Sequence, residues 1–161
     1  MTGPVVLRGT DPGDADFLRS LHLDAHPDLA RLPLPVAAAA GLVDLQVRAQ
    51  QSQYRAEFPD AQDQVIELAG VPVGRCWINW AASELRLLDI AVLSGYQGRG
   101  IGGTVLRRLC DQADAAGVPF RLSVWQANID ARRLYVELGF VVDGEHNGYL
   151  SMFRAAKTTT P

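Results

Sequence analysis

The sequence predicts a mixed α/β domain built around a glycine-rich turn in the middle of the chain. Three observations support this prediction. An apolar, partly β-branched run of strand length covers residues 85–93. Four glycines follow between residues 98 and 103. Apolar residues then recur at helical spacing from Val105 to Leu109, which indicates an amphipathic helix directly after the turn.

The other elements are predicted in order along the chain. Asp11–Asp14 offers capping carboxylates for a first helix, and prolines between residues 27 and 35 predict a loop. Gly70-Val71-Pro72 predicts a hairpin turn in an antiparallel meander, and Gly117 ends the helix that follows the central glycines. The predicted strands cover residues 5–7, 64–69, 73–80, 84–93, 120–125, 140–142 and 149–153. Further helices are predicted at residues 36–54 and 128–138.

Length and composition narrow the class of protein. A chain of 161 residues predicts a single domain, assigned here to residues 1–154, with a flexible C-terminal tail at 155–161. A formal charge of −3 provides no basic surface for nucleic acid or an anionic membrane. The N-terminal sequence has no signal-peptide pattern and no apolar run has membrane-spanning length, so we expect a cytoplasmic protein. Fourteen arginines against one lysine indicate a GC-rich bacterial genome.

Metal and disulfide chemistry are not expected. Cys76 and Cys110 lack metal-ligand spacing and fall inside a predicted strand and helix, which favours buried thiols. His22 and His26 share a helical face without a clear third ligand, and their position near a helix C-terminus is a sufficient explanation for them. We therefore predict no metal site.

A strand, a glycine-rich turn and a helix together predict a pyrophosphate cradle. Glycines remove the Cβ atoms that would keep an anion from the backbone, and the helix start supplies N–H donors and a positive dipole end. Gly98, Gly100 and Gly103 also satisfy the dinucleotide-binding fingerprint. That fingerprint needs an acid about twenty residues further on, and residues 122–126 contain none. No lysine follows the glycines, which excludes a P-loop.

Two ordered motifs resemble the GNAT superfamily of acyl-CoA-dependent N-acyltransferases. Gln97, Gly100 and Gly102 match its Q/R-x-x-G-x-G/A signature. A second signature, N-x-x-A-x-x-L-Y-x-x-x-G-F, is matched from Asn128 to Phe140. The resemblance covers residues 64–154. It implies a central, mostly antiparallel twisted sheet of six to seven strands with helices on both faces, and acetyl-CoA as the cofactor.

The resemblance also implies the cofactor-binding residues and part of the catalytic set. The expected cofactor contacts are Ile90, Ala91, Val92, Gln97, Gly98, Arg99, Gly100, Ile101, Gly102, Gly103, Thr104, Asn128, Ala131 and Tyr135. In such proteins the N–H of Ile90 or Val92 polarises the thioester carbonyl, and Tyr135 is the general acid. Taken alone, Tyr135 also fits simple helix packing, and Asn128 also fits a helix N-cap.

The general base remains open between two acids on the strand before the turn. Asp89 interrupts an apolar run, and a buried carboxylate usually has either a partner or a function. Glu84 is the other candidate. A structural hydrogen bond or an ion pair with Arg86 explains either acid equally well, and a water relay to either is also admissible.

The sequence therefore predicts an N-acetyltransferase that moves the acetyl group of acetyl-CoA directly to a primary amine. The acceptor is a small molecule or peptide shaped by residues 22–60 and 143–148, where Tyr54 fits either core packing or the acceptor site. A homodimer is also considered, because many GNAT-like proteins pair through sheet edges. The alternative is an acyl-CoA-binding sensor or assembly module without catalysis.

Overall fold

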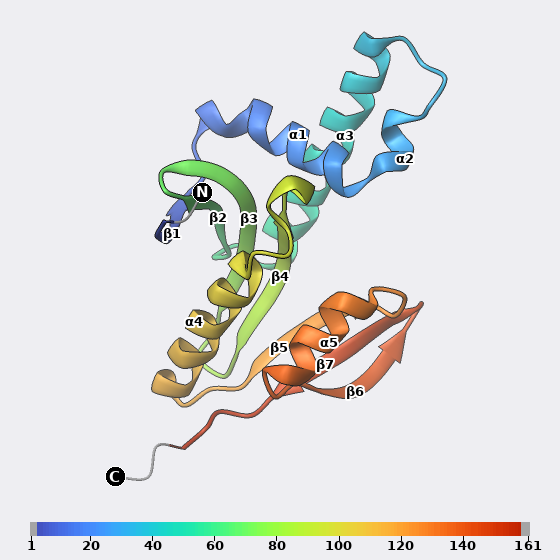
Figure 1. Ribbon diagram of the computed structural model, residues 1–161. Helices are drawn as coiled ribbons and strands as arrows, with labels where there is room; N and C mark the ends of the chain where they lie inside the picture. The colour runs from blue at the N-terminus through green and yellow to red at the C-terminus, as the bar shows by residue number, and fades with distance from the viewer. Residues whose placement is uncertain (1–2, 159–161) are drawn as a thin grey trace. The chain divides into compact units, whose positions relative to one another are not determined.

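The computed structural model describes residues 3–158, which form two compact units (Figure 1). The first unit contains the described residues up to Trp77 together with Asp89–Ile101. The second contains Ile78–Leu88 and the described residues from Gly102 onward. Strands β3 and β4 therefore contribute to both units. Among the described residues, no helix combines the length and apolarity needed to cross a bilayer.

The strands form one open sheet in the order β1-β2-β3-β4-β5-β7-β6, which is mostly antiparallel. Strands β4 and β5 are the parallel pair. The strands are β1 (Val5–Gly9), β2 (Gln62–Leu68), β3 (Val71–Trp80), β4 (Leu85–Val92), β5 (Phe120–Trp125), β6 (Val141–His146) and β7 (Tyr149–Arg154). The α-helices are α1 (Ala15–Ala25), α2 (Pro27–Ala30), α3 (Val36–Glu57), α4 (Ile101–Ala116) and α5 (Ile129–Glu137). Short 3₁₀ helices η1 (Pro12–Asp14) and η2 (Ser94–Tyr96) precede α1 and α4.

Most predicted elements are confirmed, and three differ in detail. The predicted loop at residues 27–35 contains α2, because Pro27 is well suited to the first turn of a helix. The turn between β2 and β3 is Ala69-Gly70, with φ values of 50° and 81°, so Val71 and Pro72 already belong to β3. The predicted turn at residues 143–148 is also shorter. Strand β6 continues to His146 through a bulge between Val142 and Gly144, and all of its residues are exposed, so no alternation of buried side chains marks the strand.

The first unit is held together around a buried arginine on β3. Arg75 donates to both carboxylate oxygens of Asp63, at 2.8 and 2.6 Å, and its guanidinium lies 4.4 Å from the ring centre of Trp77. Trp77 is buried and meets the edge of Tyr54 at 4.7 Å between ring centres. Trp77 is thus the core tryptophan, while Trp80 is half-buried.

The second unit packs α5 against β5 and β7. Alternate β5 residues Phe120, Leu122 and Val124 are buried, as the period of a strand requires. Phe120 meets Phe140 edge-on at 5.2 Å between ring centres. Buried Arg154 on β7 forms two hydrogen bonds with Asp114 on α4, at 2.8 and 3.0 Å. After β7, residues 155–158 contain no helix or strand, and Lys157 N–H donates to Asp114 at 2.8 Å. The remaining predicted tail residues, 159–161, lie outside the described residues.

The predicted capping carboxylates are present, but they cap η1, which precedes α1, and the α1 N-cap itself forms no side-chain hydrogen bond; buried Asp14 also pairs with half-buried Arg8. Asp11 accepts from Gly13 N–H at 2.7 Å, and Asp14 accepts from Asp11 N–H at 2.8 Å. Arg8 donates to both oxygens of Asp14 at 2.9 and 2.8 Å. This hydrogen-bonded guanidinium lowers the pKa of Asp14 to about 2. The ionised carboxylate therefore stabilises the folded state.

We expect Asp14→Asn to lower the free energy of unfolding by about 2 kcal/mol at pH 7, the size of a lost charged hydrogen bond. Because the pKa of Asp14 is lowered on folding, this stabilisation is present above the unfolded-state pKa, about 3.9, and is lost as pH falls towards 2. Urea unfolding at pH 7 and at pH 3 measures the difference. Asp16→Asn is the matched control, since the Asp16 side chain is 95% exposed. If the free energies of unfolding of variant and parent differ by the same amount at pH 7 and pH 3, the stabilising role of the ionised Asp14 carboxylate is contradicted.

Candidate functional site

The connection from β4 to α4 is short and tightly bonded. After Val92, Leu93 N–H donates to Val73 O at 2.8 Å and η2 begins at Ser94. The Gln97 carboxamide then donates to Val92 O at 2.9 Å, which ties the turn back to the end of β4. Gly98 and Gly100 have φ values of 76° and 77°, a region that L side chains disfavour. These hydrogen bonds fix the backbone of the connection, and its conformation favours glycine at two positions, 98 and 100.

Helix α4 begins directly after this turn and presents an anion-binding end. Its first three N–H groups, those of Ile101, Gly102 and Gly103, have no carbonyl partner within a helix, and the dipole is positive there. The Arg107 guanidinium folds back over Gly103, with Nη1 3.2 Å from where a Cβ would stand. Arg99 lies with its guanidinium 5.1 Å from the ring centre of Tyr96. Backbone donors and cationic side chains therefore fit a pyrophosphate at Gln97–Thr104.

Arg107 is a residue that the sequence analysis did not select. It lies on the exposed outer face of α4, and its side chain leans back towards the first turn of the helix. The signal was available, because long helical side chains lean towards the N-terminus and residues four apart are neighbours. A glycine at position 103 leaves room for that guanidinium.

Strand β4 changes its pairing along its length. Its ladder with β5 consists of Leu85↔Phe120 and Arg86↔Arg121, near the start of both strands. Further along β4, the Ala91 carbonyl oxygen lies against Gly74 on β3, where a Cβ atom would overlap it. Ile90, Ala91 and Val92 are half-buried. These are the backbone groups expected to meet the pantetheine arm and the thioester carbonyl.

The two candidate bases have different environments. Burial raises the pKa of Asp89, and this effect is opposed by the charges of Arg75 and His26 and by a hydrogen bond with Ile90 N–H. Glu84 is instead held by arginines: Arg86 Nε lies 3.2 Å from one of its oxygens and Arg121 Nε 3.7 Å from the other. The ion-pair explanation therefore applies to Glu84. Asp89 has a raised pKa and stays the predicted candidate for the base.

On α5, the motif residues have clear local roles. Asn128 is the N-cap, and its side-chain oxygen accepts from Ala131 N–H at 3.3 Å. Tyr135 is 6% exposed, and its ring meets Phe140 edge-on at 5.8 Å between centres. The packing role considered for Tyr135 is thus present. An acid role concerns only its hydroxyl and is compatible with a packed ring.

The predicted site residues are divided between the units. Asp89, Ile90–Val92 and Gln97–Ile101 belong to the first unit. The second unit contains Glu84, Gly102, Gly103, Thr104, Asn128, Ala131 and Tyr135. The chain itself joins the two groups at Ile101-Gly102, inside the first turn of α4.

The histidines of α1 have local partners. His22 and His26 stack with ring centres 4.3 Å apart; His22 Nε2 lies 3.2 Å from Gln46 Oε1, and His26 Nδ1 lies 2.9 Å from His22 O. Within residues 3–158, no group of three or more histidine, cysteine or acidic side chains is arranged to hold a metal ion. Cys76 and Cys110 are buried free thiols, and burial raises the pKa of Cys76 to about 12.

An exposed aromatic pair stands at the end of β5. Trp125 and Tyr149 are 46% and 51% exposed and meet edge-on at 5.2 Å between ring centres. The Trp125 ring covers Gly148, where a Cβ atom would overlap it. Gln126 N–H also donates to Gly148 O at 2.9 Å. The Asn147-Gly148 turn, within the region expected to shape the acceptor site, is therefore fixed against β5.

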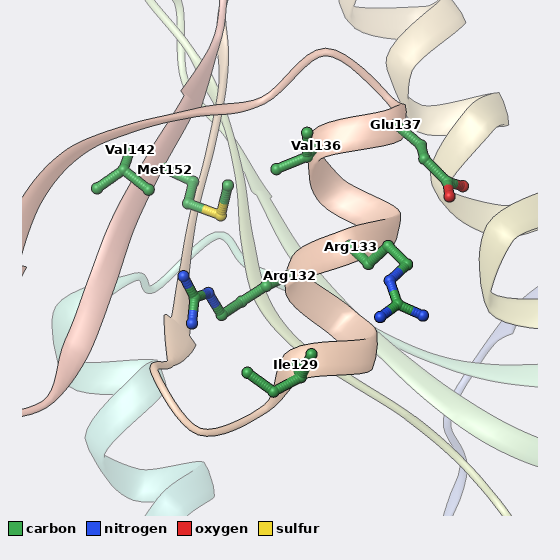
Figure 2. A pocket seen from close by; sticks show the side chains of 7 residues that line it. All are labelled: Ile129, Arg132, Arg133, Val136, Glu137, Val142 and Met152. Carbon is green, nitrogen blue, oxygen red and sulfur yellow. The ribbon is translucent and has the colours of Figure 1, made fainter.

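A separate open pocket of about 360 Å³ lies between α5 and the strands β6 and β7 (Figure 2). Its walls are Ile129, Arg132, Arg133, Val136, Glu137, Val142 and Met152. None of the predicted cofactor or catalytic residues is among them. The Arg132 guanidinium already donates to Gln126 O at 2.8 Å, which supports the turn into α5.

Comparison with known families identifies this arrangement. The model of the acetyltransferase (GNAT) family matches residues 33–140. The chain belongs to this family. Its members transfer an acetyl group from acetyl-CoA, so the protein is an acetyl-CoA-dependent acyltransferase, as the two motifs predicted. The mixed α/β GNAT-like fold is likewise confirmed. No curated protein matches the sequence.

Solved GNAT structures share the fold at low sequence identity. One is a paia N-acetyltransferase from Thermoplasma acidophilum in complex with coenzyme A, 14% identical, with a TM-score of 0.69 over 94% of this chain and 99% of that chain. Another is the ribosomal-protein-S18-alanine N-acetyltransferase from Escherichia coli, 18% identical, with a TM-score of 0.68 over 98% and 97%. A spermidine N-acetyltransferase from Vibrio cholerae, in complex with CoA and spermine, is 20% identical, with a TM-score of 0.64 over 94% and 95%.

We expect Gly74→Ala to destabilise the protein by about 2 kcal/mol, because the added methyl group must displace Ala91 and with it the end of β4. Gly9→Ala is the matched control: Gly9 also lies in a strand, and a Cβ there meets nothing within 4 Å. Thermal unfolding of both variants measures the difference. Equal melting temperatures would show that β4 accommodates the methyl group freely.

Proposed function

We propose that the protein transfers the acetyl group of acetyl-CoA directly to the primary amine of a small molecule or peptide. The observation that carries the proposal is the bonded turn from Val92 to Gly103, which ends in the first-turn N–H groups of α4. Backbone N–H groups at the start of a helix can bind a phosphate directly, without contacts from side chains. Arg99 and Arg107 add positive charge beside them.

The thioester of acetyl-CoA supplies the activated acetyl group, and the chain's task is to hold it and balance its charge. Negative charge develops on the carbonyl oxygen during attack and needs a fixed N–H donor. Ile90 N–H is already engaged by the Asp89 carboxylate. This favours Val92 N–H for the thioester oxygen. The Gln97 carboxamide supports that choice, because its bond to Val92 O fixes the end of β4.

The acceptor nitrogen loses two protons in becoming an amide, and the departing thiolate gains one; the second nitrogen proton, lost as the amide forms, returns through water to the group that protonates the thiolate. Asp89 accepts a proton from the ammonium form of the acceptor, directly or through water, since an alkylammonium with a pKa near 10.4 must be deprotonated before attack. Tyr135 donates a proton to the departing thiolate. Its ring is held by Phe140, so the position of its hydroxyl is set by packing. No covalent acyl-protein step is needed, and both buried cysteines have raised pKa values that disfavour a thiolate.

The acceptor is proposed to lie against residues 22–60 and the 143–148 turn. Beside the 143–148 turn, the exposed rings of Trp125 and Tyr149 fit an apolar or cationic group, since exposed aromatic faces bind both. This leaves the acceptor a small molecule or a peptide.

Calorimetric titration with acetyl-CoA, with NAD as the comparison ligand, tests the proposal. We expect binding of acetyl-CoA alone, followed by release of CoA thiol when a panel of primary amines is added. Gly100→Val should weaken binding at least tenfold, because a β-branched residue disfavours a φ of 77°. Failure of the folded protein to bind acetyl-CoA would refute the cradle; binding without thiol release from any amine would favour the non-catalytic module.

Tyr135→Phe tests the general acid. We expect turnover to fall by about a hundredfold, with little change in acetyl-CoA affinity, because only a proton donor is lost. Stopped-flow detection of released thiol measures turnover, and calorimetry measures affinity. The melting temperature serves as the control for packing against Phe140. Full turnover in a folded variant would remove the acid role from Tyr135.

Asp89→Asn tests the general base through pH. The raised pKa means that Asp89 becomes a working base only as pH rises above that value, so kcat/KM should increase with pH in the parent protein. In Asp89→Asn, kcat/KM should no longer rise with pH, and the rate should be about a hundredfold lower. Because the folded state favours the protonated form, the parent loses stability as pH rises through the raised pKa, and the variant should not. Glu84→Gln is the control and should keep the rise of kcat/KM with pH. If Glu84→Gln loses this rise and Asp89→Asn keeps it, Glu84 is the base.

A further inference from the structure

The 3₁₀ helix η2 at the entry to the cofactor turn has a cap from a distant part of the chain. Its own N-cap residue, Leu93, forms no side-chain cap hydrogen bond. Asp24 on α1 takes that place: one carboxylate oxygen accepts from Ser94 N–H and the other from Ser94 Oγ–H, each at 2.7 Å. The two residues are 70 positions apart in the sequence and belong to the same unit.

Local helix structure does not explain an acid at position 24. Asp24 is the second-last residue of α1, where the negative end of the helix dipole disfavours a carboxylate. At the N-terminal end of η2, the same charge is favourable, because it meets donors that would otherwise lack a partner. The position of Asp24 is therefore accounted for by Ser94 and not by α1.

We propose that Asp24 is a positioning residue for cofactor binding. By fixing Ser94, it sets the start of η2, and three residues later Gln97 bonds Val92 O and the turn enters Gly98. This inference rests on the proposed function of the Gln97–Thr104 turn. Asp24 acts only through Ser94 and touches no expected substrate atom. A surface acid near the acceptor segment could instead attract a cationic amine. Asp24 is not assigned that role, because both of its oxygens already accept hydrogen bonds from Ser94.

Asp24 also lies next to the segment that is expected to shape the acceptor site. Helix α1 ends one residue later, and Pro27 then begins the segment expected to shape the acceptor site. The Asp24–Ser94 pair thus joins that segment to the cofactor turn through two short hydrogen bonds.

Ser94→Pro removes both hydrogen bonds to Asp24 while keeping the backbone shape of the turn. Proline removes the N–H and the hydroxyl that Asp24 binds, yet it suits the first position of a helix. Leu93, with φ of −50° and ψ of 138°, already has the extended conformation required before proline. The turn is then held by the ring in place of Asp24.

The test measures acetyl-CoA affinity by calorimetry, with KM and kcat alongside, for Asp24→Ala, Ser94→Pro and the double variant. We expect Asp24→Ala to weaken acetyl-CoA binding and raise its KM about tenfold with kcat nearly unchanged, the size of lost charged hydrogen bonds. Ser94→Pro should bind nearly as the parent does. Adding Asp24→Ala to Ser94→Pro should cost nothing further. Asp16→Ala, on the same helix with an exposed side chain, is the matched control.

Two results would overturn the inference. One is parental affinity in Asp24→Ala, which indicates a structural role alone if melting temperature and kcat fall at the same time. The other is an equal tenfold loss in the presence and absence of Ser94→Pro. If Asp24→Ala does not fold, Asp24→Asn replaces it, with the same expectation at smaller size. Absence of acetyl-CoA binding in the parent protein would instead refute the proposed function.

Discussion

The structure depends on how the chain passes from β4 to α4 between Leu93 and Gly100. This short connection must turn the chain, begin a helix and leave that helix start accessible to phosphate. Glycines at two positive-φ positions permit the turn, and Gln97 and Asp24 hold it from either side with hydrogen bonds to Val92 O and Ser94. The proposed binding surface is mostly backbone. Its geometry is set by a few hydrogen-bonding side chains, of which Asp24 touches no expected cofactor atom.

Each compact unit also contains one buried arginine that joins elements distant in sequence. Arg75 links β3 to the start of β2 through Asp63. Arg154 links β7 to α4 through Asp114 and to the end of α5 through Leu138 O, at 2.9 Å. Buried charged pairs of this kind add little net stability, since both charges lose their hydration. Their bidentate geometry instead admits one relative placement of the elements they join.

Local patterns were sufficient to predict most of the elements and the glycine-rich turn before α4, whose role in cofactor binding stays a prediction. The apolar run before Gly98, the helical spacing after it and the helix end at Gly117 depend on neighbouring residues only. Two kinds of feature were beyond such reasoning. Strand β6 is exposed along its whole length and contains a bulge at Val142–Gly144, so no period of buried side chains marks it and it was predicted too short. The Asp24–Ser94 pair spans 70 positions, and no local pattern relates an acid at a helix C-terminus to a serine after a distant strand.

The near absence of lysine has a consequence for a protein that acylates amines. Guanidinium groups stay protonated and are poor nucleophiles, so the fourteen arginines are inert towards a thioester. Lys157 is the one ε-amine in the sequence, and it is exposed beyond β7, where its backbone N–H is bonded to Asp114. Basic surface built from arginine thus leaves a single side chain open to self-acetylation. A modified chain would be heavier by one acetyl group at a known position.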